Sequence, residues 1–460
     1  MKSKNIFNHY ILIVLALFTV LVSSCSNYVD IAISPNKLST EDAFSSDASA
    51  TSVILALYSY YNTTSSLPYF SFLGGLSADE LQYTGSTAEM QEFAQASVTT
   101  TNSTLKTNLW VYPYAVISET NQAISGITNS AAITTATKKQ LLGEAKFFRA
   151  YYYFNLVNYF GDVPLSLNAS VLENAYLARS SKDSVYAQII SDLKDAQSLL
   201  PTTYTTTLRT RVNQYAATAL LARVYLYTKD YTNAEAEATK VITATDVAYS
   251  LAGLSSTFIN TSSETILQFA TTYGYSFYGS AYRTSLATAV PTYVLYPKFI
   301  NSFEAGDQRK VSWIDSVTSS GTKYYKINKY KLVTANSTAV GNEYTVILRL
   351  AEQYLIRAEA RAQLNTNLAG AVSDLNAVRT RAGLPNTTAT AQGSLLAAIA
   401  SERKVELVGE NQRWFDLKRT GTADVVIGAL KATWKSTSVL YPIPATEILL
   451  NTNLTQNSGY

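Results

Sequence analysis

Two adjacent helical patterns separated by a short break constrain the fold of this chain more than any other feature. Over residues 344–383, apolar and small side chains recur at the spacing of one helix face, an Asn-Thr-Asn tripeptide at 365–367 interrupts them, and Gly383 ends them. Asn and Thr side chains compete for backbone hydrogen bonds, so the tripeptide favours a turn. The pattern predicts a pair of antiparallel helices of the tetratricopeptide type, with Tyr354 and Leu355 buried.

Similar patterns occur twice more along the chain. Residues 215–227 and 231–238 form one Ala- and Tyr-rich candidate pair, and residues 138–160 with 184–200 form another. One pair of helices cannot bury its apolar face alone, so the three pairs are expected to stack on one another. The long segments between the pairs indicate a scaffold with insertions rather than a tandem solenoid. A generic helical bundle is the alternative.

The predicted fold is therefore mainly α, with tetratricopeptide-like helical hairpins forming a scaffold over residues 40–245 and 344–460. A loop-rich insertion at about 250–343 contains short β-like runs at 265–270 and 323–332. Residues 62–101 are rich in Ser, Thr, Gly and aromatic residues, which favours irregular structure there. Further helices are expected over residues 48–61, 109–127, 394–409 and 411–420.

The N-terminus has the organisation of a secretory leader. Lys2 and Lys4 precede an apolar run at residues 10–22, which is too short to span a bilayer comfortably. The sequence Val-Ser-Ser-Cys follows and ends at Cys25, and small residues before a Cys resemble a bacterial lipoprotein cleavage site. We expect residues 1–24 to be a lipoprotein signal peptide, Cys25 to be lipidated, and residues 25–39 to be a tether. An ordinary signal peptide cleaved nearby is the alternative.

Few residues are available for catalysis. The only His is His9, which leaves with the leader, and Cys25 is the only Cys. A chain without these side chains lacks Ser-His-Asp and Cys-His triads and nearly all transition-metal sites, so we expect no enzyme activity, no metal and no cofactor. The formal net charge of +3 is small and gives no indication of a nucleic acid partner.

Carboxylates are the remaining candidates for acid–base chemistry. Asp79 and Glu80 are adjacent, and Glu402, Glu406 and Glu410 recur every four residues, which places them on one helix face. Like charges placed in this way repel one another unless cations neutralise them. We interpret the three glutamates as a structural ion network rather than a catalytic site, with Arg403, Lys404 and Arg413 as the expected partners.

Aromatic and neutral polar side chains are abundant: the chain has 34 Tyr, and charged residues make up only 15%. Aromatic faces stack on the apolar faces of sugar rings, and Asn, Gln, Ser and Thr reach the hydroxyls, so this composition suits a neutral glycan. Residues 69–83 and 273–282 carry aromatics that helix packing does not demand. The candidate ligand-binding residues are Tyr69, Tyr83, Tyr273, Tyr275, Tyr278 and Trp313. Loop packing or a contact with a partner protein is the alternative for each.

Five segments carry a resemblance to a known family. They are AKFFRAYYYFNLVNYFGDVPL at 145–165, LRLAEQYLIRAEARAQLN at 348–365, DLNAVRTRAGL at 374–384, ERKVELVGENQRWFDLKRTG at 402–421 and LYPIPATEILLNTNLTQNSGY at 440–460. In this order they resemble the SusD/RagB-like outer-membrane lipoproteins of Bacteroidota. The resemblance implies a SusD-like domain over residues 40–460, with a tetratricopeptide-like scaffold and a loop-rich ligand-binding lobe. It also implies a SusC-like TonB-dependent transporter as partner, over which the lipoprotein sits as a lid.

The expected function is that of a cell-surface glycan-binding lipoprotein, which captures oligosaccharide and passes it to the transporter. The lipid anchor would hold the protein on the outer membrane, facing the cell exterior. The same architecture capturing peptides or another nutrient is the first alternative. A hydrolase and a helical adaptor without a small ligand are the others.

Overall fold

The computed structural model describes residues 40–59, 67–271, 274–284, 286, 288–333 and 342–460. The chain divides into two compact units, residues 1–43 and 44–460. In the first unit the structure describes only helix α2 (Thr40–Ala43), so the expected leader, Cys25 and the tether lie outside the described residues. Among the described helices, none combines the length and the apolar character needed to cross a bilayer.

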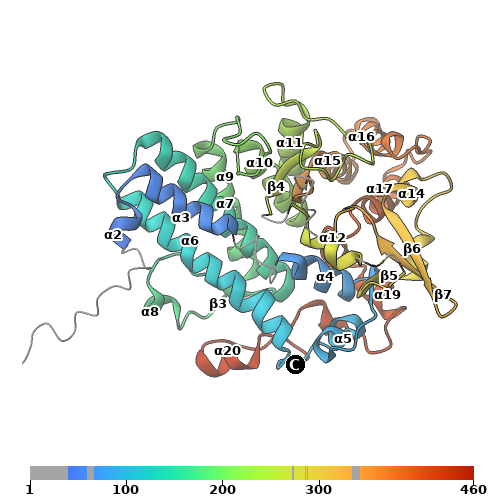
Figure 1. Cartoon of the computed structure of the whole chain (residues 1–460), viewed down its shortest axis with the longest axis horizontal. Coiled ribbons are helices and arrows are strands. Elements are labelled where there is room, and N and C mark those ends of the chain that lie inside the picture. The colour runs from blue at the N-terminus through green and yellow to red at the C-terminus, as the bar shows by residue number, and fades with distance from the viewer. Residues whose placement is uncertain (1–39, 60–66, 272–273, 285, 287, 334–341) are drawn as a thin grey trace, which may run out of the picture. The chain divides into compact units, whose positions relative to one another are not determined.

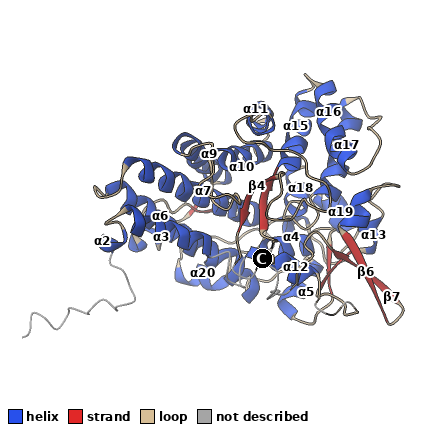
Figure 2. Ribbon diagram, turned by 45° about the horizontal axis from the view of Figure 1, so that its top comes forward, coloured by secondary structure: helices blue, strands red, loops and turns tan. Residues whose placement is uncertain are grey.

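The second unit has a scaffold of paired helices (Figures 1 and 2). Helix α7 (Thr135–Phe160) packs on α9 (Lys182–Leu199), α10 (Gln214–Tyr227) on α11 (Tyr231–Ile242), and α15 (Leu350–Leu364) on α16 (Leu368–Arg381). The pairs also contact one another, because α9 packs on α10 and α11 packs on α15. The predicted three hairpins and their stacking are therefore confirmed, and the fold is mainly α as expected.

The hairpin formed by α15 and α16 begins later than the sequence pattern predicted. Thr345–Arg349 forms strand β8, which pairs antiparallel with β4 (Thr265–Phe269), and the helix starts only at Leu350. Three consecutive β-branched residues, Thr345 to Ile347, favour a strand at this point. The predicted break is confirmed: Asn365 adopts a left-handed conformation with φ of 55°, and the side chain of Asn367 accepts a hydrogen bond from the amide of Gly370 at 2.9 Å.

The segment from residue 62 to 101 is mostly regular where it is described, so the prediction of irregular structure there was wrong. It contains α4 (Leu67–Ser77), β1 (Leu81–Tyr83) and α5 (Ala88–Gln95). The glycines that suggested a loop serve close packing instead. A Cβ atom on Gly74 would lie 2.9 Å from Oδ1 of Asn411 and 3.3 Å from the hydroxyl of Tyr159.

A four-stranded sheet, in the order β1-β5-β7-β6, lies beside the scaffold (Figure 1). Its other strands are β5 (Tyr293–Leu295), β6 (Ile314–Ser319) and β7 (Thr322–Ile327), and neighbouring strands are antiparallel. The β-like runs predicted at 265–270 and 323–332 correspond to β4 and β7. Strand β1 comes from residues far upstream of the loop-rich insertion, so the N-terminal part of the chain completes the sheet.

The remaining elements are short helices, a two-stranded ladder and flanking helices. They are α3 (Asp47–Ser59), the π-helix η1 (Leu105–Val111), α6 (Tyr112–Asn129), β2 (Val163–Pro164), α8 (Val171–Asn174), β3 (Arg179–Ser180), α12 (Phe277–Tyr282), α13 (Pro297–Ile300), α14 (Gln308–Ser312), α17 (Gln392–Glu406), α18 (Arg413–Arg419), α19 (Ala423–Gly428), the 3-10 helix η2 (Ser436–Val439) and α20 (Ala445–Leu450).

Candidate ligand-binding site

The two aromatic segments that the sequence singled out lie against each other in the structure. Phe72 on α4 contacts Tyr278 and Tyr282 on α12, with ring centroids 5.9 and 5.1 Å apart. The hydroxyls of Ser71 and Tyr282 are 2.9 Å apart, which adds a buried hydrogen bond to the same contact. Segments distant in the sequence therefore form one aromatic region, because α4 carries its aromatic side chains toward the insertion.

Three half-buried tyrosines from three different elements form the surface of this region. Tyr69 lies on α4, Tyr83 on β1 and Tyr293 on β5. The strand register places Tyr83 directly opposite Tyr293, and their ring centroids are 5.9 Å apart. Buried Phe72 lies beneath them, stacked on Tyr293 at 4.5 Å and in edge contact with Tyr69 at 6.3 Å. We call Tyr69, Tyr83 and Tyr293 the tyrosine platform.

The platform combines three aromatic rings with phenol hydroxyls, and the hydroxyl of Tyr83 accepts a hydrogen bond from the amide of Thr87 at 3.3 Å. Burial and then the nearby hydroxyls of Tyr69 and Tyr83 raise the pKa of Tyr293, so this phenol stays protonated at neutral pH. A protonated phenol can both donate and accept a hydrogen bond. The arrangement therefore fits a neutral ring that carries hydroxyl groups.

The other predicted site residues lie in different environments. Tyr275 is half-buried, with its ring 6.1 Å from that of Phe277, and Tyr273 lies outside the described residues. Tyr278 is buried and stacks on Tyr282 at 6.2 Å. Trp313 is 1% exposed, and its indole nitrogen donates to the backbone carbonyl of Leu254 at 2.9 Å.

Trp313 and Tyr278, both predicted ligand residues, therefore lie in the core and do not belong to the tyrosine platform. Tyr69, Tyr83 and Tyr275 remain predicted ligand residues. Sequence reasoning missed Tyr293, although the run of Tyr293, Val294 and Leu295 after a Pro is typical of a short strand. A strand predicted at residues 293–295 would have placed Tyr293 and Leu295 on one face of a sheet and Val294 on the other.

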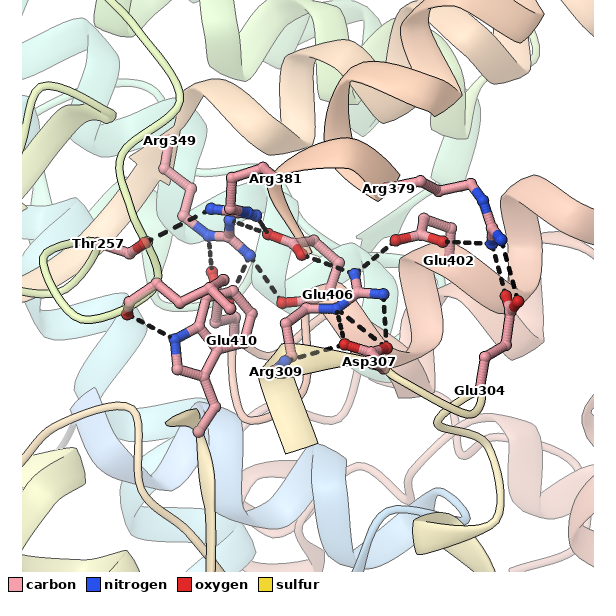
Figure 3. A network of polar contacts seen from close by, with 12 residues as sticks. Thr257, Glu304, Asp307, Arg309, Arg349, Arg379, Arg381, Glu402, Glu406 and Glu410 are labelled. Carbon is pink, nitrogen blue, oxygen red and sulfur yellow. Dashed lines mark hydrogen bonds and ion pairs between the residues drawn. The ribbon is translucent and has the colours of Figure 1, made fainter. Parts of the chain in front are cut away.

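The core behind Trp313 contains a network of ion pairs (Figure 3). Lys329, Arg381 and Arg349 lie over the Trp313 ring at 4.7, 5.2 and 5.9 Å from its centroid. Glu406 lies at the centre, bonded to Arg309, Arg349 and Arg381. The other carboxylates of the network are Glu264, Glu304, Asp307, Glu402 and Glu410, and its other cation is Arg379.

The prediction of a structural ion network at Glu402, Glu406 and Glu410 is confirmed, but the predicted partners were wrong. Arg403 pairs with Asp416, whereas Lys404 and Arg413 both pair with Asp79. The partners of the glutamates instead come from distant segments, namely α14, β7 and its continuation, β8 and α16. A spacing rule within one helix cannot identify such partners.

The ionisation of these carboxyls follows from their partners. Burial would raise the pKa of Glu406, but the positive charges of Arg381, Arg349 and Arg309 outweigh it and hold the pKa well below its usual range. The neighbouring guanidinium of Arg413 and ammonium of Lys404 likewise lower the pKa of Asp79 to about 2, against the effect of burial. Burial raises the pKa of Glu80 to about 7, and its carboxyl accepts a hydrogen bond from the amide of Gly409.

Each of these carboxyls thus has a structural partner. Within the described ranges, no group of three or more His, Cys, Asp or Glu side chains is arranged to hold a metal ion. The tyrosine platform brings together two of the predicted ligand residues, Tyr69 and Tyr83.

Comparisons with known proteins agree with this architecture. Residues 269–460 match a family model described as the SusD family, and residues 33–226 match one described as starch-binding and associating with the outer membrane. Two proteins of Formosa agariphila, SusD-like protein P2 and SusD-like protein P25, are 27% and 26% identical to this chain over 419 residues. These alignments cover 76% of this chain and 80% and 79% of the relatives.

Solved structures extend the similarity to the fold. A SusD superfamily protein from Bacteroides vulgatus superimposes with a TM-score of 0.77 over 91% of this chain and all of its own, at 20% identity. A protein described as a laminarin-binding SusD-like protein superimposes with a TM-score of 0.74 over 90% of this chain and all of its own, at 26% identity.

Proposed function

The chain belongs to the SusD/RagB family, and from this premise we propose that it is a cell-surface lipoprotein that captures oligosaccharide and passes it to a SusC-like TonB-dependent transporter. The description of one family model as starch-binding and associated with the outer membrane supports the ligand class and the location. The laminarin-binding neighbour adds support for a glycan. The observation that carries the proposal is the tyrosine platform.

The platform suits a sugar because both chemistries of a sugar ring find a partner there. The faces of a pyranose ring that expose its C–H groups are apolar and stack on aromatic rings. The ring hydroxyls need hydrogen-bond donors and acceptors. Tyr83 and Tyr293 lie opposite each other across two strands, and Phe72 fixes Tyr293 from beneath. Side chains held by neighbouring rings lose little conformational freedom when a ligand binds, which favours affinity.

Replacing a platform tyrosine with Ala is expected to weaken glycan binding by about 1–3 kcal/mol, as for aromatic stacking on other flat ligands. The variants are Tyr69→Ala, Tyr83→Ala and Tyr293→Ala, titrated by calorimetry against the best glycan from a panel that includes laminarin and starch. Tyr176→Ala is the matched control, because this side chain is 64% exposed on a different surface segment. Binding should survive in the control and fall in the platform variants.

The proposal would be contradicted if the three folded platform variants bound like the parent. It would also be contradicted if the panel gave no glycan ligand while a peptide pool bound. The second result would favour the same architecture acting on peptides.

Anchoring through Cys25 is the second part of the proposal. Two or three acyl chains hold a protein stably on a bilayer, whereas one chain binds only marginally. We expect Cys25→Ala to leave the membrane fraction or to remain unprocessed, as seen by fractionation and mass spectrometry of the mature chain. The parent protein should copurify from outer membranes with a TonB-dependent transporter. An unchanged mature mass with full membrane retention would rule out this anchor.

A further inference from the structure

A cavity with a volume of about 410 Å³ lies where α7 ends, α9 begins and α18 ends. It shares no lining residue with the tyrosine platform. The exposed side chains of Asp162, Lys182 and Asp424 mark its mouth, and the buried rings of Tyr186 and Tyr227 belong to its wall. A volume of this size can hold a small ligand.

The most unusual group in this cavity is the ammonium of Lys418. The nitrogen donates to the backbone carbonyl of Asn158 and lies 5.5 Å from the centroid of the Trp414 ring. Among the residues that the structure describes, no carboxylate forms an ion pair with Lys418 and no second acceptor binds its ammonium. Burial, and after it the positive charge of Lys182, lowers the pKa of Lys418 to about 7. Lys418 is half-buried, and a cation with reduced access to water and no anionic partner is stabilised by a bound anion.

Two further cations line the cavity without a paired carboxylate in the described part of the chain, namely Lys182 and Arg179. Lys182 at the start of α9 is exposed, so its ammonium is free to move toward a ligand. The guanidinium of Arg179 already donates to backbone carbonyls, among them those of Asp162 at 2.8 Å and Thr455 at 2.9 Å. Arg179 therefore contributes positive potential rather than a free donor.

The cavity is lined by two carboxylates, and each accepts a hydrogen bond from a neutral N–H group. Asp162 accepts a hydrogen bond from the amide of Lys182 at 2.7 Å, and Asp424 accepts one from the indole of Trp434 at 2.8 Å. Arg419 also lines the cavity, but its charge is balanced by Glu359 and Asp416. Lys182 and Arg179 balance the two carboxylates that line the cavity, so the excess positive charge of the cavity comes from protonated Lys418.

We propose that this cavity is a second ligand site that binds an oxyanion, a sulfate or a carboxylate, through the ammonium groups of Lys418 and Lys182. Each ammonium has donors to offer, and charge-assisted hydrogen bonds to oxyanions are stronger than neutral ones. The tyrosine platform presents no such cation and fits a neutral ring. The cavity therefore adds a preference for acidic ligands that the proposed capture of neutral oligosaccharide does not require.

Titration calorimetry of the intact mature protein tests this site with sodium sulfate, sodium glucuronate and glucose at constant ionic strength. Saturable binding of sulfate or glucuronate, but not of glucose, is expected. Lys418→Met should lower the affinity for the bound anion at least tenfold. Binding of sulfate and glucuronate alike indicates a general oxyanion site, whereas binding of glucuronate alone indicates an acidic sugar.

Two variants separate this effect from a general loss of structure. Lys431→Met is the control, since Lys431 also donates to a backbone carbonyl and has its pKa lowered to about 7 by burial, but is more deeply buried than Lys418 and does not line the cavity. Lys182→Met changes an exposed side chain and should fold even if Lys418→Met does not; it should weaken binding severalfold. Tyr83→Ala should leave anion binding unchanged, so failure of this proposal and failure of the glycan proposal are distinguishable.

Absence of saturable binding by both anions would overturn the proposal. Parent-like affinity in folded Lys418→Met and Lys182→Met would also overturn it.

Discussion

Replacing Arg349 with Met is expected to lower the free energy of unfolding by about 3–5 kcal/mol, the cost of removing one partner from a buried ion pair. The guanidinium of Arg349 donates to Glu406 at 2.6 Å and to Glu410 at 2.8 Å (Figure 3). It also donates to Glu264 at 2.8 Å. Arg349 and Glu406 are both almost completely buried. Met occupies a similar volume, so the lost stability reflects mainly the negative charge of the carboxylates that no longer have Arg349 as a partner.

The effect comes from the carboxylates that lose their partner. Glu406 keeps Arg309 and Arg381, and Glu410 keeps Lys329, but the buried site would carry an additional negative charge. Water cannot solvate that charge at this depth, so the folded state must either hold it or bind a proton. Glu264 keeps Arg381 as a partner at 2.9 Å, but adding Glu264→Gln to Arg349→Met removes one negative charge from the site and should recover part of the lost stability.

Urea denaturation at pH 7 measures both effects. An exposed pair supplies the control: Lys240, whose side chain is 58% exposed, pairs with Glu237 at 2.9 Å, and Lys240→Met should change the stability by less than about 1 kcal/mol. If Arg349→Met changed the free energy of unfolding by no more than Lys240→Met does, the buried ion pairs of Arg349 would not stabilise the fold as we expect.

This network shows where reasoning from the sequence reached its limit. The spacing of Glu402, Glu406 and Glu410 was sufficient to predict one helix face and a structural role. Their actual partners Arg309 and Arg349 lie on α14 and β8 and are brought there only by tertiary folding. Local spacing predicts neighbours three or four residues apart on a helix, and it contains no information on which distant segment packs against that face.

The helical pairs were predictable because their signal is local. Apolar side chains recurring with the helical period, together with an Asn that adopts a left-handed conformation at residue 365, determine where α15 ends and α16 begins. The start of α15 was misplaced because the apolar residues of β8 also satisfy the helical spacing. A short apolar run fits the side-chain period of a helix and that of a strand equally well. Only the pairing with β4 decides that residues 345–349 form a strand.

The arrangement of the candidate ligand residues was only partly predictable for a related reason. Composition indicated that Tyr69 and Tyr83 were not needed for helix packing, and both lie in the tyrosine platform. Composition could not distinguish them from Trp313, whose indole is enclosed by Phe258 and three cations from distant segments. Whether an aromatic ring in an irregular segment faces solvent or core depends on long-range packing.

The second large effect is expected at the centre of the α15–α16 hairpin, where Leu355 is completely buried. Its neighbours in the cluster come from α15, α16 and α17: Ala351, Ala358, Ala362, Ala371, Leu375, Val378, Leu395 and Ile399, all with no exposed surface. Tyr354, which was predicted to be buried beside it, is only half-buried and packs at the edge of this cluster. The side chain of Leu355 therefore packs against the small residues of α15 and α16.

Leu355→Ala is expected to destabilise the protein by about 2–5 kcal/mol, from lost burial and from the cavity that remains. The alanines of the cluster carry only methyl groups and cannot fill the space, so its closure depends on the larger side chains from α16 and α17. Leu355→Met keeps nearly the same volume and should cost less than about 1.5 kcal/mol. Leu449→Ala makes the same chemical change at a side chain that is 80% exposed and should stay within about 0.5 kcal/mol of the parent. Urea denaturation of the four proteins checks this order, and a cost below 1 kcal/mol for Leu355→Ala would mean that the hairpin core is not closely packed.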